Sequence, residues 1–178
     1  MPGSLNEILP EPISAESEEI LLELIQRKMT GAASVAVRLL HAMEERFGPE
    51  AREVVREMAG ARRPEPRPEA GDAREDLKAF CANLDRACVG SHQWERVADE
   101  PDRVAYHYTR CAWADAFREL GEPELGFILC AGDDPAVRSW NPRLGFRRTQ
   151  VLMHGDPLCD HVFLVEGDSA PDAGTDGD

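Results

Sequence analysis

Apolar residues recur at helical spacing through the first third of the chain. The first set repeats every three or four positions and comprises Ile20, Leu21, Leu24, Ile25 and Met29. It predicts a helix that begins at Ser14 or Ser17 and breaks or bends at Gly31. A second set, over residues 35–47, predicts another helix, and a short third helix follows over residues 49–58.

The apolar period changes from about 3.6 to 2 after Gly90, as expected for strands. Residues 61–72, ARRPEPRPEAGD, hold prolines and charges but nothing that seeds a core, which predicts a linker. Asp72 then suits the N-cap of a helix that reaches about Ala87. After this helix the pattern predicts a hairpin of two strands, over residues 92–98 and 104–108, and then two helices, over residues 112–120 and 123–140. A second hairpin, of strands over residues 146–153 and 161–165, follows.

These elements predict an α+β fold in which one antiparallel sheet, made of two hairpins, packs on helices. The expected organisation is an N-terminal helical segment (1–60), the Pro-rich linker (61–72), an α+β core domain (73–166) and a disordered acidic tail (167–178). The apolar faces of the N-terminal helices suit packing on the core, and they equally suit pairing with a second chain in a homodimer.

Charge and length narrow the class of protein. The 178 residues carry 34 acidic and 20 basic side chains, a net charge of −14, which disfavours nucleic-acid binding. No apolar run is long enough to span a bilayer, and no signal peptide is recognisable, so no membrane association is expected. Five cysteines suit free thiols in a reducing compartment, and the composition is of a bacterial type. The expected location is cytoplasmic.

Cys130 and Asp134 form the first candidate pair for chemistry. On a continuous helix they would share one face, where a thiol and a carboxylate suit a metal site, or a nucleophile with its general base. The alternative is that Cys130 is a small buried side chain and that Asp133 or Asp134 caps a helix starting at Pro135.

Cys159 and His161 form the second candidate pair. Strand alternation points both side chains to one sheet face. An imidazolium can lower the pKa of a thiol, so the pair suits an activated nucleophile, and it equally suits two metal ligands. A divalent metal held by Cys130, Asp134, Cys159 and His161 is therefore one expectation. A plain edge-strand cysteine with a solvent-facing histidine is the structural alternative.

Cys111 lies where a strand meets a helix, and the helix dipole there favours a thiolate. Trp94, Tyr106 and Tyr108 suit the wall of a small pocket near these cysteines, while Trp113 is read first as a core residue. The chain lacks a CxxC pair and the usual glycine-rich phosphate loops, HExxH and GxSxG. Common zinc, nucleotide and serine-hydrolase classes are thereby excluded.

The order of these segments resembles the L-2-amino-thiazoline-4-carboxylic acid hydrolase family. The similarity covers about residues 75–166, with a weaker match at residues 46–50, and rests on five segments: 108–117, 125–133, 141–142, 146–149 and 155–161. The resemblance implies a hydrolase that opens a small cyclic amidine at a C–N bond.

The implied chemistry assigns roles to the candidate residues. Cys130 or Cys159 would be the nucleophile or a metal ligand, and Asp134 or Asp133 the base or a second ligand. His161 would shuttle protons or tune the thiol. Arg110 or Arg148 would hold a substrate carboxylate, beside Cys111, Tyr108 and Trp113. The last segment is also loosely similar to the vinyl-reductase-type domain, so a non-catalytic small-molecule or metal sensor is the alternative function.

Overall fold

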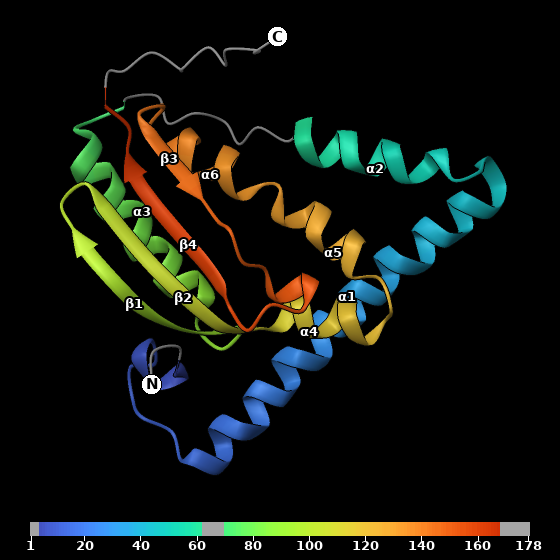
Figure 1. Cartoon of the computed structure of the whole chain (residues 1–178). Coiled ribbons are helices and arrows are strands. Elements are labelled where there is room, and N and C mark those ends of the chain that lie inside the picture. Colours follow the sequence, from blue (N-terminus) through green and yellow to red (C-terminus); the bar gives the residue numbers. More distant parts are fainter. Residues whose placement is uncertain (1–3, 62–69, 168–178) are drawn as a thin grey trace, which may run out of the picture.

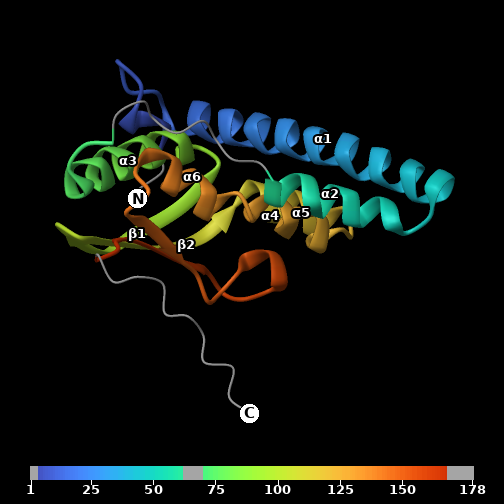
Figure 2. The ribbon, with the colours of Figure 1, turned by 90° about the horizontal axis from the view of Figure 1, so that it is seen from above.

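The computed structural model describes residues 4–61 and 70–167. Four strands form one antiparallel sheet, and the helices gather on one of its faces (Figures 1 and 2). The strands are β1 (His92–Glu100), β2 (Arg103–Cys111), β3 (Leu144–Arg147) and β4 (Cys159–Val165). The helices are α1 (Ala15–Phe47), α2 (Glu50–Ala61), α3 (Ala73–Cys88), α4 (Ala112–Glu119), α5 (Pro123–Cys130) and α6 (Asp133–Trp140), with 3-10 turns η1 (Leu5–Glu7) and η2 (Leu152–His154). The predicted α+β class is confirmed.

The sheet has the strand order β1-β2-β4-β3, and every neighbouring pair is antiparallel. The pairs β1–β2 and β3–β4 are the two predicted hairpins. Pairing of β2 with β4 joins them into one sheet, with Tyr106 opposite His161 and Tyr108 opposite Cys159. Residues more than 50 positions apart in the chain therefore become direct neighbours at the centre of the sheet.

Alternate residues of the two central strands point toward the helices and build the core. On β2 these are Val104, Tyr106 and Tyr108, and all three are buried. Phe80 of α3 packs its ring 5.1 Å from that of Phe163 on β4 and 5.6 Å from that of Trp140 on α6. The aromatic layer fixes α3 and α6 against the sheet, because such ring pairs bury large apolar areas in defined geometries.

The predicted break at Gly31 is wrong, because α1 is one continuous helix of 33 residues. A glycine inside a helix costs about 1 kcal/mol relative to alanine. Ala33, Val37 and Leu40 on one side of α1 are buried, and the helix packs along α4 and α2. That packing outweighs the local penalty. In the described part of the chain, no helix is both long and apolar enough to cross a membrane.

Two other predicted boundaries are corrected. The expected helix over residues 123–140 is two helices, α5 and α6, separated by Ala131 and Gly132. The expected strand over residues 146–153 ends at Arg147. The backbone amides of Thr149 and Gln150 bond to the Asp160 carboxylate instead of to a neighbouring strand, which bends the chain away from the sheet. Residues 62–69 of the predicted linker and residues 168–178 of the predicted tail lie outside the described residues.

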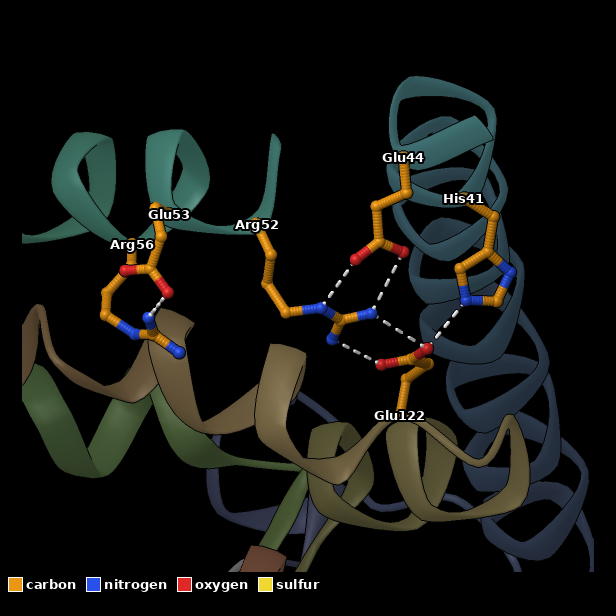
Figure 3. Close-up of polar contacts among 6 residues, drawn as sticks. All are labelled: His41, Glu44, Arg52, Glu53, Arg56 and Glu122. Carbon is orange, nitrogen blue, oxygen red and sulfur yellow. Dashed lines mark hydrogen bonds and ion pairs between the residues drawn. The ribbon is translucent and has the colours of Figure 1, made fainter. Parts of the chain in front are cut away.

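An ion-pair cluster fastens α2 to the rest of the helical layer (Figure 3). Arg52 of α2 donates to Glu44 of α1 at 2.8 Å and to Glu122, at the start of α5, at 2.8 Å. His41 of α1 lies 2.6 Å from the same Glu122 carboxylate. The Arg52 guanidinium lowers the pKa of both carboxyl groups by hydrogen bonding. Three helices are thus cross-linked by one arginine, with Arg56 and Glu53 paired further along α2.

Gly126 of α5 is expected to tolerate no side chain. A methyl group there would lie 2.6 Å from Met153 Cε and 2.8 Å from Phe117 Cδ2, and Phe117 is fully buried. We expect Gly126→Ala to lower the free energy of unfolding by about 1–3 kcal/mol, as overpacked cores do, despite the better helix propensity of alanine. Urea denaturation measures this. Gly132→Ala is the matched control, since its methyl would make only an ordinary contact at 3.6 Å; equal losses in both variants would contradict the expectation.

Candidate functional site

Three cysteines from separate elements gather where β2 ends and β4 begins. Cys111 is the last residue of β2 and the N-cap of α4, Cys130 ends α5, and Cys159 is the first residue of β4. Charge on Cys111 or Cys159 raises the pKa of Cys130, and charge on Cys159 raises that of Cys111, so the three thiols share one region of the fold. Their convergence on one cavity stays a prediction.

Arg148 supplies the positive charge of this cluster. Its side chain is only 10% exposed, and Nη1 donates to Asp133 Oδ2 at 2.8 Å. The guanidinium also lies 5.4 Å from the ring centres of both Phe127 and Phe146, a cation–π arrangement. Burial raises the pKa of Asp133, and Arg148 opposes that rise. A buried guanidinium held between two rings is stiff and only partly neutralised, which suits binding of a planar anion.

His161 lies near Arg148, and one of its ring nitrogens has no hydrogen-bond partner among the described residues. Its ring centre is 4.8 Å from that of Tyr108 and 5.0 Å from that of Phe146. Among the described residues, its buried Nε2 atom has no hydrogen-bond partner. Burial, together with the positive charge of Arg148, lowers the pKa of His161 to about 3. The imidazole is therefore neutral at physiological pH, and its Nε2 atom can accept a hydrogen bond from a bound molecule.

The three thiols differ in how strongly their surroundings resist ionisation. Burial raises the pKa of Cys130 to about 12. Burial also raises the pKa of Cys111, but the backbone amides of Ala114 and Trp113 at the start of α4 oppose the rise. At Cys159 the rise is opposed by the Leu152 amide, which donates to Sγ at 3.2 Å, and by Arg148. Cys159 thus has both a donor and a cation ready to stabilise a thiolate.

Asp160 fixes the loop that carries Arg148. Its carboxylate accepts from the Thr149 amide at 2.8 Å, from the Thr149 hydroxyl at 2.5 Å and from the Gln150 amide at 2.5 Å. Although partial burial opposes the change, these donors lower the pKa of Asp160. Since Asp160 lies between Cys159 and His161 on β4, one strand holds the thiol, the imidazole and the anchor of the arginine loop.

The side chains of several other predicted residues have partners of their own or are buried. Asp134 accepts from Arg138, whose guanidinium also pairs with Glu166, so its carboxylate belongs to another ion pair. Arg110 donates to Gln26 of α1 at 2.9 Å and lies 3.4 Å from Asp115. Trp113 stacks on Phe117, with ring centres 6.0 Å apart. Tyr108 is buried on the same sheet face as Cys159 and His161.

The described residues offer no ready-made metal site. Among them, no three histidine, cysteine, aspartate or glutamate side chains come close enough to hold one ion. With Asp134 engaged by Arg138, a divalent metal at Cys130, Asp134, Cys159 and His161 stays a prediction from the sequence alone.

The sequence does not reveal several members of the cluster. It offers Asp133 as a helix cap or as an alternative base or ligand to Asp134, whereas in the structure Asp133 pairs with Arg148. The pattern predicts a core position for Phe127 and indicates no role for Phe146 or His92. His92 lies with its ring 5.6 Å from Tyr108, and burial lowers its pKa to about 4. The only available signal was the nearness in sequence of these residues to the chosen ones.

Comparison with known proteins identifies the family. Residues 26–163 match the model of the L-2-amino-thiazoline-4-carboxylic acid hydrolase family. No curated protein matches the chain. Two solved structures are distantly similar. One is the phenol-responsive sensory domain of the transcription activator PoxR with phenol, at 9% identity and a TM-score of 0.40, covering 77% of this chain and 74% of that one. The other is a trafficking protein particle complex subunit 3 from Naegleria fowleri covalently bound to palmitic acid, at 8% identity and a TM-score of 0.34, covering 84% and 97%. Because the family match spans most of the sequence, the chain belongs to the L-2-amino-thiazoline-4-carboxylic acid hydrolase family.

Proposed function

We propose that the protein hydrolyses a small cyclic amidine that carries a carboxylate, of the L-2-amino-thiazoline-4-carboxylate type, with Cys159 as nucleophile and with the neutral His161 imidazole orienting a water that relays the proton. The observation that carries this proposal is the placement of Cys159 and His161 on one sheet face beside the buried Arg148. A thiol, a neutral base and a cation are the groups that acyl-transfer chemistry on an amidine carbon requires.

The reaction proceeds in two stages. Residues two apart on a strand are separated by about 6.6 Å, so a water bonded to His161 Nε2 would bridge the thiol and the imidazole. As Sγ bonds to the amidine carbon and the ring C–N bond breaks, the thiol proton passes through this water to the departing nitrogen, because the low pKa of His161 keeps the imidazole neutral. A second water then attacks the same carbon, and its proton passes by the same path to the departing thiolate. One water is consumed and the ring is opened.

Arg148 orients the substrate. One of its N–H groups donates to Asp133, and the other N–H groups of the guanidinium would bind the substrate carboxylate in bidentate fashion. The stacked Phe127 and Phe146 rings keep the guanidinium in one plane. Binding of the substrate anion would add negative charge beside Asp133 and so raise the pKa of that carboxyl further.

The direct test is turnover of L-2-amino-thiazoline-4-carboxylate by the purified full-length protein, followed by NMR, with acid-quenched peptide mass mapping of the adduct. We expect ring opening and a covalent adduct on Cys159. Removing the carboxylate, as in 2-aminothiazoline, is expected to lower kcat/KM by about 10- to 150-fold, the worth of a charged hydrogen-bonded contact. Absence of turnover, or an adduct on Cys130 instead, would overturn the proposal.

A second candidate function is supported by a specific observation: burial raises the pKa of all three clustered thiols. A neutral, aromatic-lined cluster with one buried arginine also suits a sensor that binds a small carboxylate without reacting. Calorimetric binding of L-2-amino-thiazoline-4-carboxylate, with the compound recovered unchanged, would favour the sensor over the hydrolase.

A further inference from the structure

Four consecutive backbone amides in the loop after β3 donate to side chains instead of to the backbone of a neighbouring strand. The acceptors are three side chains from the segment where β4 begins. In chain order, the donors are Thr149, Gln150, Val151 and Leu152, and their acceptors are Asp160, Asp160, Asp156 and Cys159. Since backbone N–H groups in a folded chain need acceptors, these three side chains determine the path of the loop.

Asp160 holds the first two of these amides, directly after Arg148. Both amides donate to the same atom, Oδ1, at 2.8 Å from Thr149 and 2.5 Å from Gln150. The other oxygen, Oδ2, accepts from the Thr149 hydroxyl. On the preceding side, Arg147 is the last residue of β3 and pairs with β4. The backbone at Arg148 is therefore held by the sheet before it and by the Asp160 carboxylate after it.

The place of the Arg148 guanidinium depends on that backbone. A guanidinium binds a carboxylate in bidentate fashion only where its plane and position fit the anion. Asp133 and the rings of Phe127 and Phe146 contact the far end of the side chain, whereas Asp160 sets the point from which the side chain starts. Displacing a group that orients a substrate by about 1 Å can lower the rate on the order of 100-fold.

We propose that Asp160 is the positioning residue that makes the site selective for substrates with a carboxylate, because its side chain places Arg148. This inference rests on the proposed function, in which Arg148 binds the substrate carboxylate. Asp160 acts through the loop and not by contact with the substrate. Its removal therefore abolishes the preference for the carboxylate, whereas loss of a residue that only stabilises the fold affects all substrates alike.

The test compares Asp160→Ala and Asp160→Asn in the full-length protein, with L-2-amino-thiazoline-4-carboxylate and 2-aminothiazoline as substrates. In Asp160→Ala we expect the ratio of the two kcat/KM values to fall from about 10–150 to below about 3. Asparagine keeps the oxygen that accepts both amides, and its NH₂ group can donate to the Thr149 hydroxyl. Asp160→Asn should therefore restore most of the ratio. A merely structural role would lower both kcat/KM values equally and leave the ratio unchanged.

Asp72→Ala is the matched control. The Asp72 carboxylate also accepts from two consecutive backbone amides, those of Arg74 and Glu75, but at the start of α3. Loss of this helix cap lowers stability, and the ratio should stay at its wild-type value. Circular dichroism checks the fold of all three variants. An unchanged ratio in Asp160→Ala, or an equal fall in Asp72→Ala, would overturn the inference.

Calorimetry separates this inference from the proposed function. If the wild type binds L-2-amino-thiazoline-4-carboxylate without hydrolysing it, we expect Asp160→Ala to raise the dissociation constant at least about tenfold and Asp160→Asn to raise it less than about threefold. That pattern would contradict the hydrolase and support the role of Asp160. Turnover with an unchanged ratio would support the hydrolase and contradict the role of Asp160. Absence of both binding and turnover in the wild type would overturn both.

Hydrogen exchange of the wild type tests the loop without a substrate or a variant. The amides of Thr149 and Gln150 should exchange more slowly than those of an unstructured loop, because both donate to the Asp160 carboxylate. NMR measures exchange at each amide. Unprotected exchange at both positions would overturn the inference even if Asp160→Ala failed to fold.

Discussion

Replacing Cys159 with serine is expected to lower kcat on the order of a thousandfold, because a serine hydroxyl is a far weaker nucleophile than a thiol without a strong base in contact. Serine retains an acceptor for the Leu152 amide, which donates to Sγ at 3.2 Å, so the fold should persist. KM should change little, since Arg148 still binds the carboxylate. Steady-state kinetics with L-2-amino-thiazoline-4-carboxylate measures both constants.

Two cysteine variants serve as controls. Cys130→Ser tests the competing nucleophile, and because burial raises the pKa of Cys130 to about 12, we expect less than about a tenfold effect on kcat. Cys81→Ser changes a buried thiol of α3 that has no part in the proposed reaction, and it should lower stability without altering kcat. A larger loss with Cys130→Ser than with Cys159→Ser would transfer the nucleophilic role to Cys130.

The secondary structure was largely predictable because its signals are local. The change of apolar period after Gly90 indicates the sheet, whereas the pairing of Tyr106 with His161 depends on which strands of the two hairpins meet, and no local pattern specifies that. The continuity of α1 through Gly31 was not predictable, since it depends on packing against α4 and α2. The prediction that the strand continues beyond Arg147 was also wrong. The backbone amides of Thr149 and Gln150 donate to the carboxylate of Asp160 on β4 and not to the backbone of a neighbouring strand.

The sequence indicated which residues form the candidate site, but it did not indicate which side chains contact one another there. Alternation on β4 correctly placed Cys159 and His161 on one face. The choice of Asp134 over Asp133 assumed an unbroken helix, and the break between α5 and α6 turns Asp134 toward Arg138 instead. The setting of Arg148 between Phe127 and Phe146 is a long-range arrangement that no local pattern encodes.

The buried histidines are expected to make the protein acid-sensitive, and His161→Phe to remove about half of that sensitivity. Burial lowers the pKa of His161 to about 3 and that of His92 to about 4, whereas an unfolded histidine titrates near 6.5. The unfolded state therefore binds more protons below pH 6.5, so stability is present above that value and is lost as pH falls toward the folded-state pKa values. Carboxyl groups whose pKa the fold lowers, such as Asp160, also lose their stabilising contribution, but at lower pH.

From pH 7.5 to pH 5, linkage gives a loss of about 2 kcal/mol for each histidine. Phenylalanine at position 161 fits beside the Tyr108 and Phe146 rings and removes the unpartnered Nε2 atom, so the variant should be at least as stable as the wild type at pH 7.5. At pH 5 it should exceed the wild type by about 2 kcal/mol in urea denaturation. Parallel stability curves for the two proteins over this range would mean that the His161 imidazole is not buried in neutral form, and its role as the acceptor that orients the relaying water would fall with it.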